Sequence, residues 1–392
     1  MKKISITILT IISLVSCSPS AERPSTELSI NYEKIELENG LHVIFHLDKS
    51  DPVVAVELMV HVGSAREIQG RTGFAHLFEH LLFLESENLG KGGLDKMSAR
   101  IGGSGANGST SRDRTNYLQT VPKDGLEKMI WAEADKLGYF INTVTDPVLA
   151  KEKQVVKNEK RQSYDNRPYG YNQYVIGKNL YPKDHPYNWQ VIGSLEDLQN
   201  ATLQDVKNFY KKWYVPNNAT LVLSGDIDIE QATKWVHHYF DEIPKGTEEI
   251  TALEKRPGFV KETKFIYYED NFARVPQLTM VWPTVESYHP DAYALKVLSQ
   301  YLTEGKSAPL NQVLIADLKL TSSTSMYSGN SELAGEVQVS VRAFNGVHLT
   351  EIKAGIEKGF LKFENEGISV DDLNQIKAGQ ETRFYRSLSS VL

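Results

Sequence analysis

Three polar side chains interrupt an apolar stretch and have the spacing of a metal site. His76, Glu79 and His80 lie within residues 74–84, whose other members are all apolar. The apolar residues recur at helical spacing, so the pattern predicts a helix with both imidazoles on one face. Two imidazoles placed in this way suit a single Zn²⁺ ion. Burying three ionisable groups so close together would be costly without a metal or charged partners.

The same motif supplies a base for hydrolysis. Glu79 follows His76 by three residues, so it lies near the shared face without having to be a ligand. Zinc lowers the pKa of a bound water to about 7, and a nearby carboxylate can then accept its proton. This is the chemistry of the His-x-x-Glu-His motif. So short a motif is not specific in a chain with 10 histidines, and its alternative is a helix whose histidines only pack against polar neighbours.

A third ligand is expected from a second helix. A catalytic zinc site uses three protein ligands and keeps one position open. Glu152 and Glu159 lie about two turns apart within a predicted helix at 147–164, so they share one face. One carboxylate would bind the metal, while the other would orient a histidine ligand by a hydrogen bond. For an isolated pair, two solvated surface charges are the more common interpretation.

Two successive series of strands and helices must position these residues. The first series has a hairpin turn at Asn39-Gly40 and predicted strands at 33–37, 41–45, 53–62, 114–121 and 219–224. Its predicted helices are 74–84, 126–140, 147–164, 203–213 and 230–240. Residues 102–109, which are rich in glycine, and a stretch containing Pro168, Pro182 and Pro186 are expected to be irregular.

A polar break at 244–249 separates the second series from the first. Predicted strands follow at 264–268, 277–282, 320–327 and 335–342, with helices at 292–302, at 351–363 and from 370 onward. Because the order of elements repeats, we predict an α+β fold with two similar halves. The first half is residues 29–245, and the second half is residues 246–392.

The N-terminus has the pattern of a bacterial lipoprotein signal. Lys2 and Lys3 precede an apolar run at 4–15, and Cys17 is the only cysteine of the chain. We therefore expect a signal peptide at 1–17, lipidation of Cys17 and a flexible tether at 18–28. This would anchor the protein in the bacterial cell envelope, at the outer membrane facing the periplasm or the surface. The alternative is a plain signal peptide or an anchor helix with a chance cysteine.

Composition argues against one class of partner. The net charge is −7, and no block rich in lysine and arginine occurs. Proteins that bind nucleic acid usually carry such a basic patch. Nucleic acid is therefore not an expected partner.

Several ordered blocks of residues resemble the pitrilysin family of zinc peptidases, which also includes insulysin and the mitochondrial processing peptidase. The first block is Gly63, Ser64, Glu67, Gly73, His76, Glu79 and His80, and the second is Gly102, Gly103, Asn107, Thr110, Asp113, Thr115 and Tyr117. The third block is Glu152 and Glu159. The last blocks are His185, Pro186, Tyr187, Ile192, Gly193, Tyr214, Pro216, Asn217, Gly225 and Asp226.

The resemblance implies a fold, an activity and a set of site residues. It implies two related α/β-sandwich domains with mostly antiparallel sheets: a zinc-binding catalytic domain at 29–245 and a truncated domain of the inactive type at 246–392. It implies that one Zn²⁺ is held by His76, His80 and Glu159, that Glu152 supports a ligand and that Glu79 is the base. The implied activity is that of a metalloendopeptidase acting on short or unfolded peptides.

The resemblance also implies how peptides and partners would bind. The strand containing Asn107, Gly108, Ser109 and Thr110 would pair with substrate backbone, although its glycines also favour turn chemistry. Gly108 stands where the family usually has alanine. The arginine and tyrosine that embrace substrate in the family have no counterpart here, so a second pitrilysin-like half is expected from a missing C-terminal segment, a homodimer or a heterodimer partner. The alternatives are a non-catalytic subunit and a surface-binding lipoprotein with a structural zinc.

Overall fold

The computed structural model describes residues 29–388. The predicted signal peptide, Cys17 and the whole predicted tether at 18–28 lie outside this range. Within it, every helix is too short or too polar to cross a membrane.

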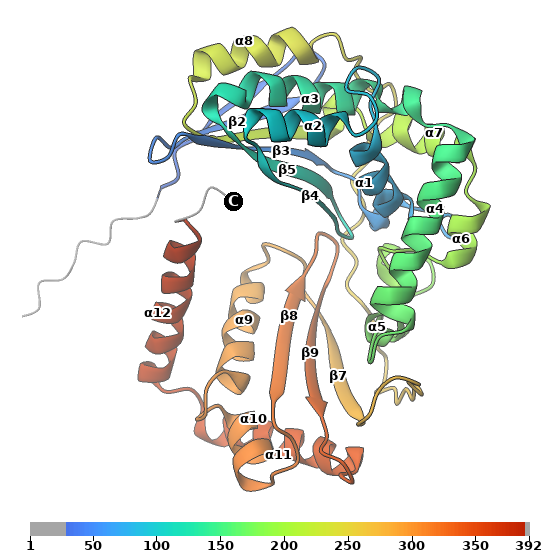
Figure 1. Ribbon diagram of the computed structural model, residues 1–392. Coiled ribbons are helices and arrows are strands. Elements are labelled where there is room, and N and C mark those ends of the chain that lie inside the picture. Colours follow the sequence, from blue (N-terminus) through green and yellow to red (C-terminus); the bar gives the residue numbers. More distant parts are fainter. Residues whose placement is uncertain (1–28, 389–392) are drawn as a thin grey trace, which may run out of the picture. The chain divides into compact units, whose positions relative to one another are not determined.

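A six-stranded sheet forms the centre of the first half, in the order β1-β2-β6-β3-β5-β4 (Figure 1). Its strands are β1 (Glu33–Glu36), β2 (His42–Leu47), β3 (Val53–Val60), β4 (Ser104–Thr110), β5 (Thr115–Pro122) and β6 (Ala219–Gly225). Only the β2–β6 pair is parallel, and the other four pairs are antiparallel. The predicted α+β class with mostly antiparallel pairing is confirmed, as is the hairpin at Asn39-Gly40, where Gly40 has a φ of 87°.

Helices cover this sheet and complete its core. In Figure 1, α2 (Gly93–Ile101), α3 (Leu126–Tyr139) and α8 (Ile229–Phe240) lie together along one face of the sheet. Helices α1 (Phe74–Leu84), α4 (Asp146–Lys160), α6 (Leu195–Asn200) and α7 (Leu203–Trp213) belong to the same half. The predicted apolar stripe of α1 is buried, at Phe74, Leu77, Phe78, Leu81 and Leu82. The predicted helix at 74–84 is confirmed, because α1 begins and ends at these residues.

Two stretches expected to be irregular are ordered. Residues 104–110 form strand β4, which pairs with β5 with a register shift between Ser104 and Asn107. Their glycines tolerate a strand because β4 is at the edge of the sheet and pairs with only one strand among the described residues. The stretch with Pro168, Pro182 and Pro186 contains α5 (Asn172–Leu180), since its prolines fall outside that helix.

The second half repeats part of this sheet. Strands β7 (Gln277–Thr284), β9 (Gly335–Arg342) and β8 (Thr324–Asn330) are ordered β7-β9-β8 and are antiparallel, as are β3, β5 and β4. Helices α9 (Pro290–Thr303), α10 (Pro309–Asn311), α11 (Leu349–Glu366) and α12 (Val370–Ser387) accompany it. Its own core is built around Leu310, Leu314, Val339, Ile352 and Ile356.

One predicted strand was wrong. Residues 264–268 have the composition of a strand, but they pair with no other strand among the described residues. Phe265 and Tyr267 are 80% and 88% exposed. A strand needs a neighbour for its backbone groups, and local composition cannot supply one.

Candidate metal centre

Helix α1 places two imidazoles on one face, as its period predicts. The ring centroids of His76 and His80 lie 4.7 Å apart. The helix begins after Gly73, whose φ of 91° suits glycine. Glu67 caps this end, because its buried carboxylate accepts hydrogen bonds from the amides of Gly73 and Ala75, both at 2.9 Å. Burial raises the pKa of Glu67 to about 8.

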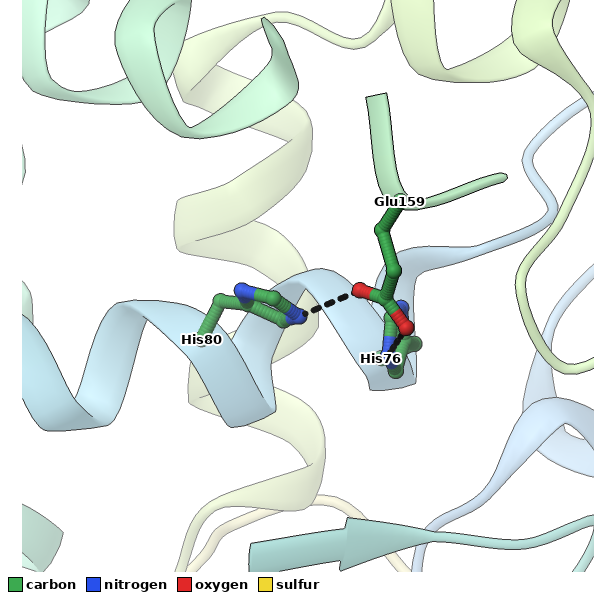
Figure 2. Close-up of side chains that lie close together, drawn as sticks. All are labelled: His76, His80 and Glu159. Atoms are coloured by element: carbon green, nitrogen blue, oxygen red, sulfur yellow. Dashed lines mark ion pairs between the residues drawn. The ribbon is translucent and has the colours of Figure 1, made fainter. Parts of the chain in front are cut away.

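Glu159 reaches this pair from α4 (Figure 2). Its Oε2 lies 3.1 Å from Nε2 of His80, and its Oε1 lies 3.7 Å from Nε2 of His76. One ligand atom from each of the three half-buried residues falls within 4.8 Å of the others. Two imidazole nitrogens and one carboxylate oxygen that converge in this way fit a three-ligand zinc site with an open position.

The protonation of His76 favours a metal. Burial, followed by the nearby His80, lowers the pKa of His76 to about 4. The imidazole is therefore neutral near pH 7, as a metal ligand must be. Its Nδ1 is buried and has no hydrogen-bond partner within residues 29–388. Nε2 of this ring faces Glu159 at 3.7 Å and is therefore placed to bind a cation together with that carboxylate.

Glu152 contacts the other side of His80. Its Oε1 lies 3.1 Å from Nδ1 of His80, and the carboxylate is only 4% exposed. Burial lowers the pKa of His80, but the hydrogen bond and charge of Glu152, with Glu159 and Glu79, raise it overall. A buried carboxylate on Nδ1 fixes the ring so that Nε2 points toward Glu159. The structure therefore gives the two glutamates different positions, which the sequence spacing alone left open.

Glu79 lies beside the three candidate ligands and is hydrogen-bonded to β4. Its Oε2 accepts a hydrogen bond from Oγ1 of Thr110 at 2.5 Å. Burial raises the pKa of Glu79, while the Thr110 hydrogen bond opposes that rise. The carboxylate is thus oriented, and its surroundings favour accepting a proton. The hydroxyl contact of Thr110 was not predicted, because only the pairing of β4 against β5 brings Thr110 over α1.

The other residues of β4 divide between its two faces. Asn107 and Ser109 are exposed, whereas Gly108 and Thr110 are half-buried and face α1, as strand alternation requires. A Cβ at Gly108 would lie 2.9 Å from the Phe83 ring and 3.0 Å from Cγ of Glu79. Glycine here therefore allows β4 to approach the candidate base closely. Among the described residues, Oδ1 of Asn107 accepts a hydrogen bond from the amide of Gly108 at 3.0 Å, and Oγ of Ser109 donates to Oδ1 of Asn116 at 2.7 Å.

Glu67 is a site-related residue to which the sequence analysis gave no role. The sequence did offer one signal, because Glu67 lies between two glycines of the first block. Its role as a helix cap could not be predicted, since that role depends on tertiary contacts. Thr72 and Asp197 lie beside it, with hydrogen bonds of 2.5 and 3.0 Å from the hydroxyl and amide of Thr72 to Asp197. These contacts anchor the start of the helix that carries His76, Glu79 and His80.

Two family models and several known proteins match this chain. Residues 42–176 match the family model described as Insulinase (Peptidase family M16), and residues 200–380 match Peptidase M16 inactive domain. Zinc protease PqqE of Helicobacter pylori is 31% identical over 92% of this chain and 80% of that protein. The uncharacterized zinc protease YmxG of Bacillus subtilis is 24% identical over 90% of this chain and 84% of that protein.

Solved structures show the same fold. The crystal structure of a protease from Helicobacter pylori has a TM-score of 0.83 and 28% identity, and the match covers 92% of this chain and 86% of that one. Pitrilysin has a TM-score of 0.68 at 19% identity, covering 89% of this chain and 38% of that one. The first half of the periplasmic protease PqqL from Escherichia coli has a TM-score of 0.68 at 20% identity, covering 91% of this chain and 78% of that one.

Proposed function

Because this chain belongs to the insulinase family of peptidases, peptidase family M16, we propose that it is a zinc-dependent endopeptidase that hydrolyses short or unfolded peptides. The observation that supports this most directly is the convergence of His76, His80 and Glu159, with Glu79 beside them. The relatives named zinc proteases support the choice of metal.

The proposed chemistry divides between a cation and the side chains around it. His76, His80 and Glu159 would hold Zn²⁺, which, when bound, polarises a carbonyl and makes water more acidic. Glu79 would accept the proton of the attacking water and return it to the leaving amine. Thr110 keeps the Glu79 carboxylate in position through its 2.5 Å hydrogen bond. Glu152 holds the His80 ring at Nδ1.

Strand β4 is the proposed binding site for peptide backbone. It is the last strand of its sheet, so its outer backbone groups have no strand partner among the described residues. An extended peptide could add to this edge by main-chain hydrogen bonds, which select for shape rather than sequence. Asn107 and Ser109 would face that peptide from exposed positions, while Thr110 links the same strand to Glu79.

A second M16 half is the proposed partner. The chain resembles the first half of PqqL, and the match covers only 41% of the complete PqqL chain. We propose that a further half, from the same polypeptide or from a homodimer or heterodimer partner, helps to hold the substrate. Such positioning can supply several kcal/mol of a reaction barrier.

The alternative is a non-catalytic subunit. The match of residues 200–380 to the inactive-domain model is the observation that favours it. Against it, the region matching the Insulinase model keeps His76, Glu79, His80 and Glu159 in converging positions.

Substitution of the candidate base separates these two functions. Glu79→Gln should keep stoichiometric zinc, because the three ligands remain, but should lose hydrolysis of a quenched fluorescent peptide by about 100-fold or more, since the proton acceptor is gone. Glu127→Gln makes the same chemical change at an exposed position of α3 and serves as the control. Full activity of zinc-loaded Glu79→Gln would refute the mechanism, and a zinc-loaded wild type that cleaves no peptide would favour the non-catalytic subunit.

We also propose that the chain is lipid-anchored at Cys17 in the bacterial cell envelope. The support is the sequence pattern alone: the Lys2-Lys3 start, the apolar run and the single cysteine.

A further inference from the structure

The turn that joins β8 and β9 inserts into the first half. Leu333 and Ala334, at its tip, are each only 1% exposed. They belong to a buried apolar cluster whose other members come from the first half: Ala65, Ile176, Leu180, Tyr181 and Tyr187. The tip of the second half therefore completes a small core beside the first sheet.

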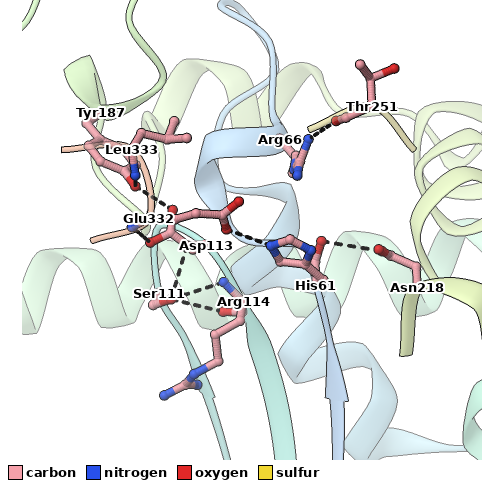
Figure 3. Close-up of polar contacts among 10 residues, drawn as sticks. All are labelled: His61, Arg66, Ser111, Asp113, Arg114, Tyr187, Asn218, Thr251, Glu332 and Leu333. Atoms are coloured by element: carbon pink, nitrogen blue, oxygen red, sulfur yellow. Dashed lines mark hydrogen bonds and ion pairs between the residues drawn. The ribbon is translucent and has the colours of Figure 1, made fainter. Parts of the chain in front are cut away.

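Two side chains of the first half accept hydrogen bonds from the backbone of this turn. The amide of Glu332 donates to Oδ2 of Asp113 at 2.9 Å, and the amide of Leu333 donates to the Tyr187 hydroxyl at 2.9 Å (Figure 3). The same hydroxyl donates to Oδ1 of Asp113 at 2.6 Å. We call Asp113, Tyr187, Glu332 and Leu333 the turn latch.

The hydrogen-bonding groups of the turn latch are suited to a stable contact between the two halves. Burial, with help from the hydrogen bond to Asp113, raises the pKa of Tyr187, so its hydroxyl keeps its proton and remains a donor. A side-chain hydrogen bond lies beside the same contact, because Oε2 of Glu332 lies 2.6 Å from Nε2 of His61. The hydroxyl and both amides are thus satisfied where water has little access.

The turn latch is close along the chain to Thr110, the residue that is hydrogen-bonded to the candidate base. Asp113 lies in the turn that follows β4, and Thr110 is the last residue of β4. The turn is stiff, because Oγ of Ser111 accepts from the amides of Asp113 and Arg114, both at 3.1 Å. Its backbone is also tied to the segment before α1, where the amide of Ala65 donates to the carbonyl of Arg112 at 2.7 Å.

We infer that Asp113 and Tyr187 are positioning residues through which the second half sets the place of Thr110 against Glu79. Strand β4 pairs only with β5 in the described part of the chain, so the position of its end depends on this one strand and on the contacts of the turn that follows it. The turn latch attaches the turn after β4 to the second half. The inference rests on the proposed function for its kinetic consequences, but not for its structural ones.

Tyr187→Phe tests the turn latch with little change in packing. The ring stays in the apolar cluster, while the amide of Leu333 and Oδ1 of Asp113 each lose a partner. We expect kcat for peptide hydrolysis to fall about tenfold, an effect within the range for two lost hydrogen bonds, with zinc content unchanged and KM changed much less. Tyr139→Phe is the control for removal of a tyrosine hydroxyl elsewhere, where the hydroxyl donates one hydrogen bond, to Glu242 at 2.9 Å.

A double-mutant cycle tests the path through Thr110. Thr110→Val removes the hydroxyl that contacts Glu79. If Tyr187 acts through Thr110, Tyr187→Phe should change kcat by less than about twofold in the Thr110→Val background. Effects that multiply, or a Tyr187→Phe effect confined to zinc content or the folded fraction, would overturn the inference.

Amide hydrogen exchange tests the same inference without hydrolysis. Peptides covering 104–115 should exchange faster in Tyr187→Phe than in the wild type or in Tyr139→Phe. Unchanged exchange in this segment would refute the turn latch in an active or an inactive protein. A wild type that is inactive with zinc would instead refute the proposed function, and the exchange result would still decide on the latch.

Discussion

The two glutamates of α4 should differ in how they affect zinc. Glu159 lies near Nε2 of both histidines, at 3.7 Å from His76 and 3.1 Å from His80, whereas Glu152 contacts only Nδ1 of His80. Glu159→Gln removes an anionic ligand from the site. Glu152→Gln keeps an oxygen that can accept the His80 proton but removes the charge that makes the ring a better ligand.

The geometry gives the size of each effect. For Glu152→Gln we expect zinc affinity to fall by about 10- to 100-fold, or about 1.4–2.7 kcal/mol, as for partners that support a ligand. For Glu159→Gln the loss should exceed that range, because one of three protein ligands is removed. Peptide hydrolysis should fall in the same order when both variants are assayed at limiting zinc.

The assay is competition for zinc against a chromophoric chelator, with thermal unfolding of the metal-free proteins to show that each variant folds. Glu127→Gln, exposed on α3, is the control for the loss of one carboxylate. If Glu152→Gln loses as much affinity as Glu159→Gln, or more, the ligand has been assigned to the wrong glutamate.

Three further outcomes are expected. In the folded state the pKa of Glu67 is about 8, whereas the ordinary value is 4.5. The protonated Glu67 side chain therefore contributes its full share to the free energy of unfolding below pH 4.5, and this share is lost as pH rises toward 8. Urea unfolding of the metal-free proteins at pH 5, 6.5 and 8 should therefore show that the wild type loses stability relative to Glu67→Gln as pH rises. The loss should be at most about 1.4 kcal/mol for each pH unit. If the free energies of unfolding of the two proteins change in parallel with pH, the pKa of Glu67 is not raised. Gly108→Ala should reduce kcat several-fold with zinc retained, since its methyl would meet Phe83 and Glu79 at 2.9 and 3.0 Å, and unchanged kinetics would show that β4 can move away freely. Cys17→Ser should shift the protein from the membrane to the soluble fraction on cell fractionation, and continued membrane association would count against a lipid anchor.

Local chemistry was enough to predict the parts of the site that lie on one helix. The apolar period of residues 74–84 predicted α1 at both ends, and the spacing of His76 and His80 then put both rings on one face, because helix geometry repeats every 3.6 residues. The Asn39-Gly40 hairpin was also predictable, because a short turn with a glycine at positive φ carries its own backbone preference.

Contacts between distant segments could not be predicted in this way. The glycine-rich residues 104–110 have weak strand propensity, and pairing with β5 made them a strand. Residues 264–268 have strong strand composition, yet without a neighbouring strand they remain unpaired in the described chain.

The sequence by itself determined the identity of the candidate metal ligands on α1 and the base between them, because those residues are held in one helical frame. Only the tertiary structure decided that Glu152 faces Nδ1 of His80 while Glu159 faces Nε2, and that Thr110 orients Glu79. It also decided that the tip of the second half docks on Asp113, 219 residues away from Glu332 along the chain. Such contacts depend on how whole elements pack, and a side chain's type and spacing do not encode which distant backbone it will meet.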